Sequence, residues 1–208
     1  MIIFLSGGRT VCSYMLVYDE KELINKLMEK AQERIYNNLK RLLKAGAGPV
    51  VRFGGAEYAT PPLMSNEYFD WLVFQYDSPL MDLCTKLGRK VAVHCHGHIR
   101  HALKRFAEMG VTQTDPVEET PDGDINLKEA RRITNDRIVL TGYIQMRELY
   151  NEDASYIRER VKKIIREAGH DNLIVSTTGT PLEKMTQKLL DNYNAMIDAV
   201  KEEGYAGN

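Results

Sequence analysis

Two histidines separated by a single residue, His94 and His96, are the side chains with the clearest chemical potential in this chain. They lie at the end of a short apolar run, Lys90 to His94, which is typical of a buried strand. Side chains alternate between the faces of a strand, so we expect both imidazoles to point the same way if the strand continues through them. Imidazole binds zinc and other borderline metals well. The spacing predicts a metal site. The alternative, that the two histidines fall together in a polar loop by chance, explains the spacing about as well.

Carboxylates at neighbouring strand ends could complete such a site. Glu57 follows Gly54-Gly55-Ala56 directly after another short β-branched run, which makes it the preferred third metal ligand; a solvated loop glutamate is the alternative. Glu57, Tyr58 and Asp115 are the candidate catalytic residues. Glu118 offers a further carboxylate on the same rim of the sheet, the one formed by the carboxyl ends of its strands. Helix capping or simple exposure explains Asp115 and Glu118 almost as well.

Three further residues are candidates for substrate binding by position alone. Tyr143 and Gln145 follow one predicted strand, and Thr178 follows the last. Cys95 should face away from the two histidines, and we expect it to be a small packed residue rather than a ligand or nucleophile.

The elements that must position these residues alternate regularly along the chain. The apolar spacing predicts helices over residues 19–45, 66–87, 99–109, 127–134, 154–168 and 182–203, and strands over 49–53, 90–94, 111–114, 138–141 and 173–176, with 2–5 as a further strand. Pro79 should kink or split the second of these helices. Strands that alternate with amphipathic helices indicate an α/β fold with a parallel sheet, in a single domain over residues 1–208.

Composition excludes several classes of function. The 28 basic residues nearly balance the 29 acidic ones, so no net positive field recruits nucleic acid or an anionic membrane. No apolar stretch is long enough to span a membrane. Three widely spaced cysteines argue against a disulfide framework and favour a reducing, cytoplasmic location.

The phrases FGGAEYATPP, KVAVHCHGHIR, EMGVTQTDPVE and RIVLTGYIQ resemble the uroporphyrinogen decarboxylase superfamily, which includes corrinoid-linked methyltransferases. The resemblance implies a partial (β/α)8 TIM-type barrel that corresponds to the later part of the family domain. We therefore expect the first strands to be missing and the domain to be incomplete at its N-terminus. A truncated gene, a partial chain or a natural short form that pairs with a partner would each explain this.

The resemblance also implies alternative activities. In the methyltransferase branch an H-x-C-G motif and a later cysteine bind zinc, which activates a thiol; here His96 replaces the first cysteine, and no cysteine stands near Gly179-Thr180. Metal-dependent methyl transfer to or from a thiol or corrinoid is the favoured reading, with a corrinoid protein and a small molecule as partners and a homodimer as the expected assembly. The alternatives are a decarboxylase that acts on a tetrapyrrole and a non-catalytic barrel fragment.

Overall fold

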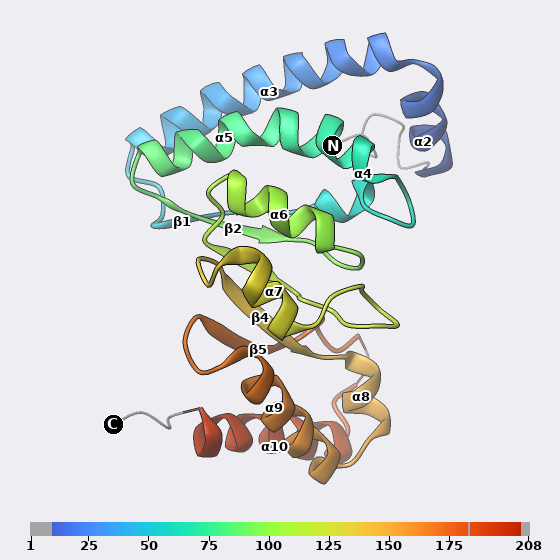
Figure 1. Cartoon of the computed structure of the whole chain (residues 1–208), viewed down its shortest axis with the longest axis vertical. Helices are drawn as coiled ribbons and strands as arrows, with labels where there is room; N and C mark the ends of the chain where they lie inside the picture. The colour runs from blue at the N-terminus through green and yellow to red at the C-terminus, as the bar shows by residue number, and fades with distance from the viewer. Residues whose placement is uncertain (1–9, 183, 205–208) are drawn as a thin grey trace.

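The computed structural model describes residues 10–182 and 184–204, and these form a parallel sheet covered by helices (Figure 1). The strands in this part of the chain are β1 (Val50–Phe53), β2 (Lys90–His94), β3 (Gln113–Asp115), β4 (Val139–Ile144) and β5 (Leu173–Thr177). They lie side by side in sequence order, and every neighbouring pair is parallel. The carboxyl ends of the strands therefore meet along one edge of the sheet.

Helices connect each strand to the next, as parallel pairing requires. The helical elements are α2 (Thr10–Asp19), α3 (Lys21–Lys44), the 3-10 turn η1 (Ala56–Ala59), α4 (Asn66–Phe69), the π-helical turn η2 (Asp70–Phe74), α5 (Gln75–Lys86), α6 (Arg100–Glu108), α7 (Leu127–Thr134), α8 (Met146–Asn151), α9 (Ala154–Ala168) and α10 (Gln187–Glu203). Successive helices pack against one another, α3 on α5, α6 on α7, α7 on α9 and α9 on α10. Figure 1 shows this series from α3 at one end of the molecule to α10 at the other.

Local sequence explains where these helices begin and end. The Asn126 side chain accepts a hydrogen bond from the Glu129 N–H at 2.9 Å and so caps the start of α7. Asn135 ends that helix in the left-handed conformation, with φ of 48°. In α9, Ile157, Val161 and Ile164 recur at the helical spacing and are buried.

The helical run from α4 to α5 is interrupted, but not at Pro79, where the sequence predicted a kink or a split: α5 continues as α-helix through the proline. The interruption is the π-helical turn Asp70–Phe74, one turn before the proline. Because Pro79 has no N–H, α5 lacks the one hydrogen bond that this residue would donate to the Gln75 carbonyl, yet the backbone stays helical. The Ser78 hydroxyl donates to the Phe74 carbonyl, four residues earlier in the run.

The core lies between the sheet and the helices. Val91 and Val93 of β2 belong to this core, which places His94 on the opposite face of the strand. Gly142 of β4 permits a close approach of two helices: a Cβ there would lie 2.6 Å from Ile164 Cγ2 of α9 and 3.1 Å from Leu127 Cδ1 of α7.

The predicted fold class is confirmed, with differences in detail. The predicted bounds of β2, α7 and α9 agree with the structure. The predicted helix over residues 19–45 begins only at Lys21, the one over 182–203 begins at Gln187, and α2 and α8 were not predicted. The proposed strand over residues 2–5 lies outside the described residues. In those that are described, β1 and β5 form the two free edges, so the sheet is an open arc rather than a closed barrel. None of the described helices is both long and apolar enough to cross a membrane.

Candidate active site

The histidine segment, residues 94–97, leaves the sheet at the carboxyl end of β2. The Cys95 N–H still donates to the Asp115 carbonyl at 2.9 Å, so pairing with β3 continues one residue beyond the strand. Gly97 then turns the chain with φ of +81°, a left-handed conformation that glycine adopts without steric cost. The two histidines therefore stand on an extended segment just before a fixed turn.

The imidazoles of His94 and His96 lie side by side. Their ring centroids are 4.6 Å apart and their planes are nearly perpendicular, at 89°. His94 Nδ1 lies 3.4 Å from Asp115 Oδ2, and His96 Nδ1 lies 3.2 Å from Glu118 Oε2. Neither Nε2 atom has a hydrogen bond within the described part of the chain. Each ring is thus oriented by a carboxylate through one nitrogen, and its other nitrogen is available.

Glu118 is the centre of a hydrogen-bond network that joins four strand ends. Its side chain is only 5% exposed. Its Oε2 also accepts from the Gly97 N–H at 2.9 Å, and its Oε1 accepts from Gln145 Nε2 at 2.8 Å. Thr178 Oγ1 donates in turn to Gln145 Oε1 at 2.9 Å. His96, Glu118, Gln145 and Thr178 follow β2, β3, β4 and β5 in that order, so one chain of contacts crosses the rim.

This network sets the charge of its two titratable members. Burial alone would raise the pKa of Glu118, but hydrogen bonds from His96, Gly97 and Gln145 outweigh burial and hold that pKa below its ordinary value. The hydrogen bond to Glu118 is the main cause that raises the pKa of His96 above its ordinary value, against burial, which lowers it. The pair therefore favours an imidazolium and a carboxylate. With a side chain that is 38% exposed, protonated His96 can donate a proton to a bound molecule.

Arg52 of β1 adds a positive charge to the same rim. Its Nη2 donates to Asp115 Oδ2 at 2.7 Å, the oxygen that also faces His94. The Arg52 side chain is 60% exposed, so the pair contributes only about 0–1 kcal/mol to stability. Its remaining donors can bind an anionic group of a substrate. With Arg52, all five described strands supply a residue to the site.

Glu57 and Tyr58, two of the three catalytic candidates from the sequence, separate in the structure. The negative charge of Glu57 acts on His96 and Cys95, so its carboxylate lies close to the histidine segment. Glu57 Oε2 is buried and has no hydrogen-bond partner in the described residues. The Tyr58 side chain is exposed and lines an apolar cavity together with Tyr14. Only Glu57 therefore joins the histidines.

Cys95, which stands between the two histidines in the sequence, is fully buried in the core. Burial raises the pKa of its thiol well above the ordinary value, so the thiol stays protonated and unreactive. The expectation of a packed residue agrees with this position.

The site as described supplies two converging imidazoles rather than a complete metal centre. Across residues 10–182 and 184–204, no three His, Cys, Asp or Glu side chains are arranged to hold a metal ion. The predicted third ligand, Glu57, lies nearby with an unpartnered buried oxygen, which is the chemistry that a third ligand requires. The unpartnered Glu57 oxygen and the Nε2 atoms of the two histidines are chemically suited to a divalent metal, although the described residues are not arranged around one point.

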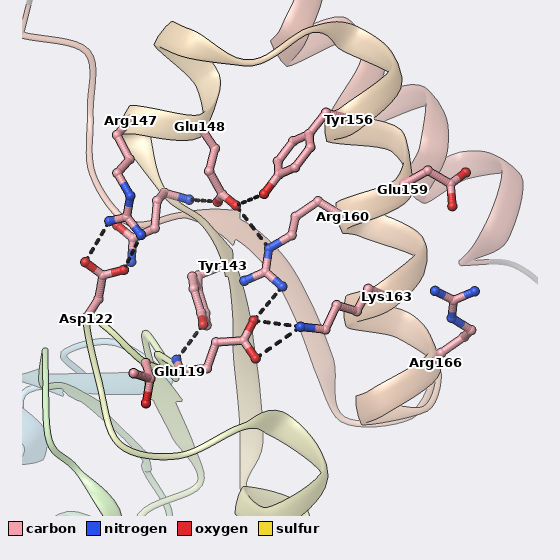
Figure 2. A pocket seen from close by; sticks show the side chains of 12 residues that line it. Glu119, Asp122, Tyr143, Arg147, Glu148, Tyr156, Glu159, Arg160, Lys163 and Arg166 are labelled. Atoms are coloured by element: carbon pink, nitrogen blue, oxygen red, sulfur yellow. Dashed lines mark hydrogen bonds and ion pairs between the residues drawn. The ribbon is translucent and has the colours of Figure 1, made fainter.

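Tyr143 lies apart from the histidines, in the wall of a second cavity of about 460 Å³ (Figure 2). Its hydroxyl oxygen accepts a hydrogen bond from the Glu119 N–H. Burial raises the pKa of Tyr143 to about 12, so the phenol is neutral. Gln145 lines the same cavity while its amide holds Glu118, so it connects the two regions.

Sequence reasoning missed some features of the site and underrated another. Arg52 was not considered, although an arginine within a predicted buried strand was an available signal, because arginine is rarely fully buried. Glu118 was recognised only as a further rim carboxylate. The cations of α9 that face the second cavity, Arg160, Lys163 and Arg166, were also missed; their spacing of three residues was the available signal.

Comparisons with known proteins place this geometry in a family. The model of the uroporphyrinogen decarboxylase (URO-D) family matches residues 4–203. No curated protein matches the chain. A solved methyltransferase from Methanosarcina mazei matches with a TM-score of 0.68 and 20% identity, over 92% of this chain and 53% of that chain. A D-psicose 3-epimerase solved in the presence of D-fructose gives a TM-score of only 0.39 at 10% identity, over 83% of this chain and 77% of that one, and supports no argument.

The likeness to the methyltransferase concerns the fold alone, because the identity is low. The chain spans about half the length of that protein, and its open arc of strands is the corresponding part of a TIM-type barrel, as the sequence resemblance implied. The family match covers nearly the whole chain. The chain therefore belongs to the uroporphyrinogen decarboxylase (URO-D) family.

Proposed function

We propose that this chain acts as an enzyme that transfers a methyl group to or from a thiol or a corrinoid with the help of a divalent metal. One observation carries the proposal: His94 and His96 lie together, and each directs Nδ1 at a carboxylate. Histidines that bind metals usually have this arrangement, because the carboxylate fixes the ring and makes the other nitrogen a better donor.

Three side chains would hold the metal, His94 and His96 through Nε2 and Glu57 through its unpartnered oxygen. Two nitrogens and one oxygen suit zinc and leave a fourth position open, which is typical of catalytic rather than structural zinc. Bound zinc would stabilise the thiolate form of a substrate thiol and so make it a better nucleophile at neutral pH.

The chain's own residues then have distinct tasks. Asp115 and Glu118 orient the imidazoles, and Gln145 with Thr178 fixes Glu118 in turn. Arg52 binds a negatively charged part of the small-molecule substrate beside His94. A corrinoid would reach this open rim on a partner protein, which matches the exposure of Arg52 and His96 at the carboxyl edge.

The raised pKa of His96 favours a second candidate, a decarboxylase that acts on a tetrapyrrole carboxylate. In that reaction the carbon–carbon bond to the carboxylate breaks, carbon dioxide leaves, and the electron pair stays on carbon. His96 donates its proton to this carbon, and Arg52 binds a remaining carboxylate of the substrate. A metal has no role in this scheme, so metal content separates the two candidates.

The test is the zinc content of the purified protein, measured by elemental analysis after reconstitution and removal of loosely bound metal. His94→Ala and His96→Ala are compared with His98→Ala, a control that removes a neighbouring histidine outside the pair. We expect about one metal per chain in the wild type and the control, and a loss in both paired variants. Metal-loaded protein should then methylate a test thiol with methylcobalamin as donor.

A well-folded wild type that retains no metal would rule out the methyl-transfer proposal. Tetrapyrrole binding that weakens in Arg52→Gln would then support the decarboxylase candidate. Retention of metal in His96→Ala would show that another group of ligands holds it.

A further inference from the structure

Four positive side chains and four carboxylates line the cavity beside β4 and α9 (Figure 2). Arg160, Lys163 and Arg166 follow one another at intervals of three residues, so they project from one side of α9. Arg147 of α8 reaches the cavity from another side. The cavity is about 460 Å³, which is large enough for a small molecule.

Carboxylates neutralise these cations unevenly. Asp122 pairs with Arg147 through both oxygens, at 2.6 and 2.5 Å. Glu119 is shared, 2.7 Å from Arg160 Nη1 and 2.9 Å from Lys163 Nζ. In the part of the chain that the structure describes, Arg166 forms no ion pair, although it lines the cavity. The cations and carboxylates of the lining are thus equal in number, and Arg166 is the cation that no described carboxylate pairs with.

Two hydrogen-bond donors that face this region are also unused. Arg160 is only 11% exposed, and its Nε is buried without a hydrogen-bond partner among the described atoms; Glu148 Oε1 lies 3.3 Å away, without suitable bonding geometry. The Tyr143 hydroxyl accepts from the Glu119 N–H, so its own proton is free to be donated. The guanidinium of Arg160 stacks over the Tyr143 ring at 5.1 Å, which brings the two donors together. Buried donors without partners are rare and call for an explanation.

We propose that this cavity binds an oxyanion group of a small molecule, a phosphate or a carboxylate, through Arg160, Lys163, Arg166 and the Tyr143 hydroxyl. Charge-assisted hydrogen bonds to arginine are the usual means by which proteins hold such groups. The site is separate from the histidine pair, although Gln145 contacts both, and it does not depend on the proposed methyl transfer.

The test is titration calorimetry at low ionic strength with two probes, inorganic phosphate and malonate. Lys163→Gln and Arg166→Gln remove cations at the cavity, whereas Lys162→Gln removes the neighbouring lysine of α9, which does not line it. All three positions are on the helix surface, and circular dichroism checks that each variant folds. We expect saturable binding of at least one probe, weakened about tenfold in the two cavity variants and unchanged in Lys162→Gln.

A stronger response to phosphate identifies a phosphate ester as the ligand class, and a stronger response to malonate identifies a carboxylate. Absence of saturable binding by both probes overturns the proposal. Equal weakening in Lys162→Gln also overturns it, because the binding would then reflect the general charge of the helix.

Discussion

His96 Nδ1 and Glu118 Oε2 lie 3.2 Å apart, and each residue shifts the pKa of the other in the direction that favours the charged pair. The two residues follow neighbouring strands, so the pair also joins the loops after β2 and β3. Stability, protonation and the orientation of a candidate ligand thus depend on the same contact.

The His96–Glu118 pair should make the stability of the metal-free protein depend on pH. The raised pKa of His96 gives a stabilisation that is complete below its ordinary value of 6.5 and is lost as pH rises through the folded value. The lowered pKa of Glu118 gives a second stabilisation, which is present above its ordinary pKa of 4.5 and is lost as pH falls through the pKa of the folded state. Urea denaturation should therefore show the wild type more stable at about pH 5.5 than at about pH 8.5. Glu118→Gln should lose most of this difference; an unchanged difference would assign it to other groups.

Removal of the carboxylates that orient the imidazoles should weaken metal binding. Asp115→Asn and Glu118→Gln keep the side-chain size but remove the negative charge that faces each Nδ1. We expect each to lower zinc affinity about 10- to 100-fold in competition with a chelator. Asp82→Asn, on the exposed surface of α5, is the matched control and should bind zinc normally. Normal affinity in both site variants would separate these carboxylates from metal binding.

Gly142 should not tolerate a side chain. The added Cβ of Gly142→Ala would lie 2.6 Å from Ile164 Cγ2, on a helix that is packed between neighbours. Overpacking of this kind lowers the free energy of unfolding by about 1–3 kcal/mol. Gly179→Ala is the control, because its Cβ would meet Met146 Cγ at an ordinary 3.6 Å. If chemical denaturation gives both variants wild-type stability, the approach of α9 to β4 is looser than described.

Asn192 should be required to join α10 to α8. Its buried Nδ2 donates to the Leu149 carbonyl at 2.9 Å and to the Glu152 carbonyl at 2.8 Å. Asn192→Ala leaves both carbonyls without this donor. We expect the free energy of unfolding to fall by about 2 kcal/mol. Asn194→Ala changes an exposed residue of the same helix and should have little effect in the same thermal denaturation experiment. Equal effects of the two changes would contradict this role of Asn192.

The sequence predicted those elements whose signals are local. Leu127–Thr134 and Ala154–Ala168 were placed correctly because apolar spacing and a capping asparagine act within one or two turns. The short helix α8 was missed because six residues show little periodicity, although the Glu148 side chain accepts from the Gln145 N–H at its start. The strand over residues 111–114 was displaced because β3 pairs for only three residues, and its neighbours determine its limits.

The candidate site was predicted only where it lies on one segment. His94 and His96 are two residues apart, so strand alternation alone indicated that they converge. The hydrogen bond from Gln145 to Glu118 joins residues 27 positions apart, and the Arg52–Asp115 contact spans 63. Such contacts depend on strand order and register, which periodicity does not contain.

The run of contacts across the rim has a consequence for how such a protein can evolve. His96, Glu118, Gln145 and Thr178 each come from a different strand–helix unit, and the hydrogen bonds pass from one unit to the next. A substitution of one of these four residues therefore alters a single link while the sheet beneath stays intact, because none of the four belongs to the hydrophobic core. Related chains can in this way acquire new substrates by successive small changes at one rim, without a change in the scaffold that supports it.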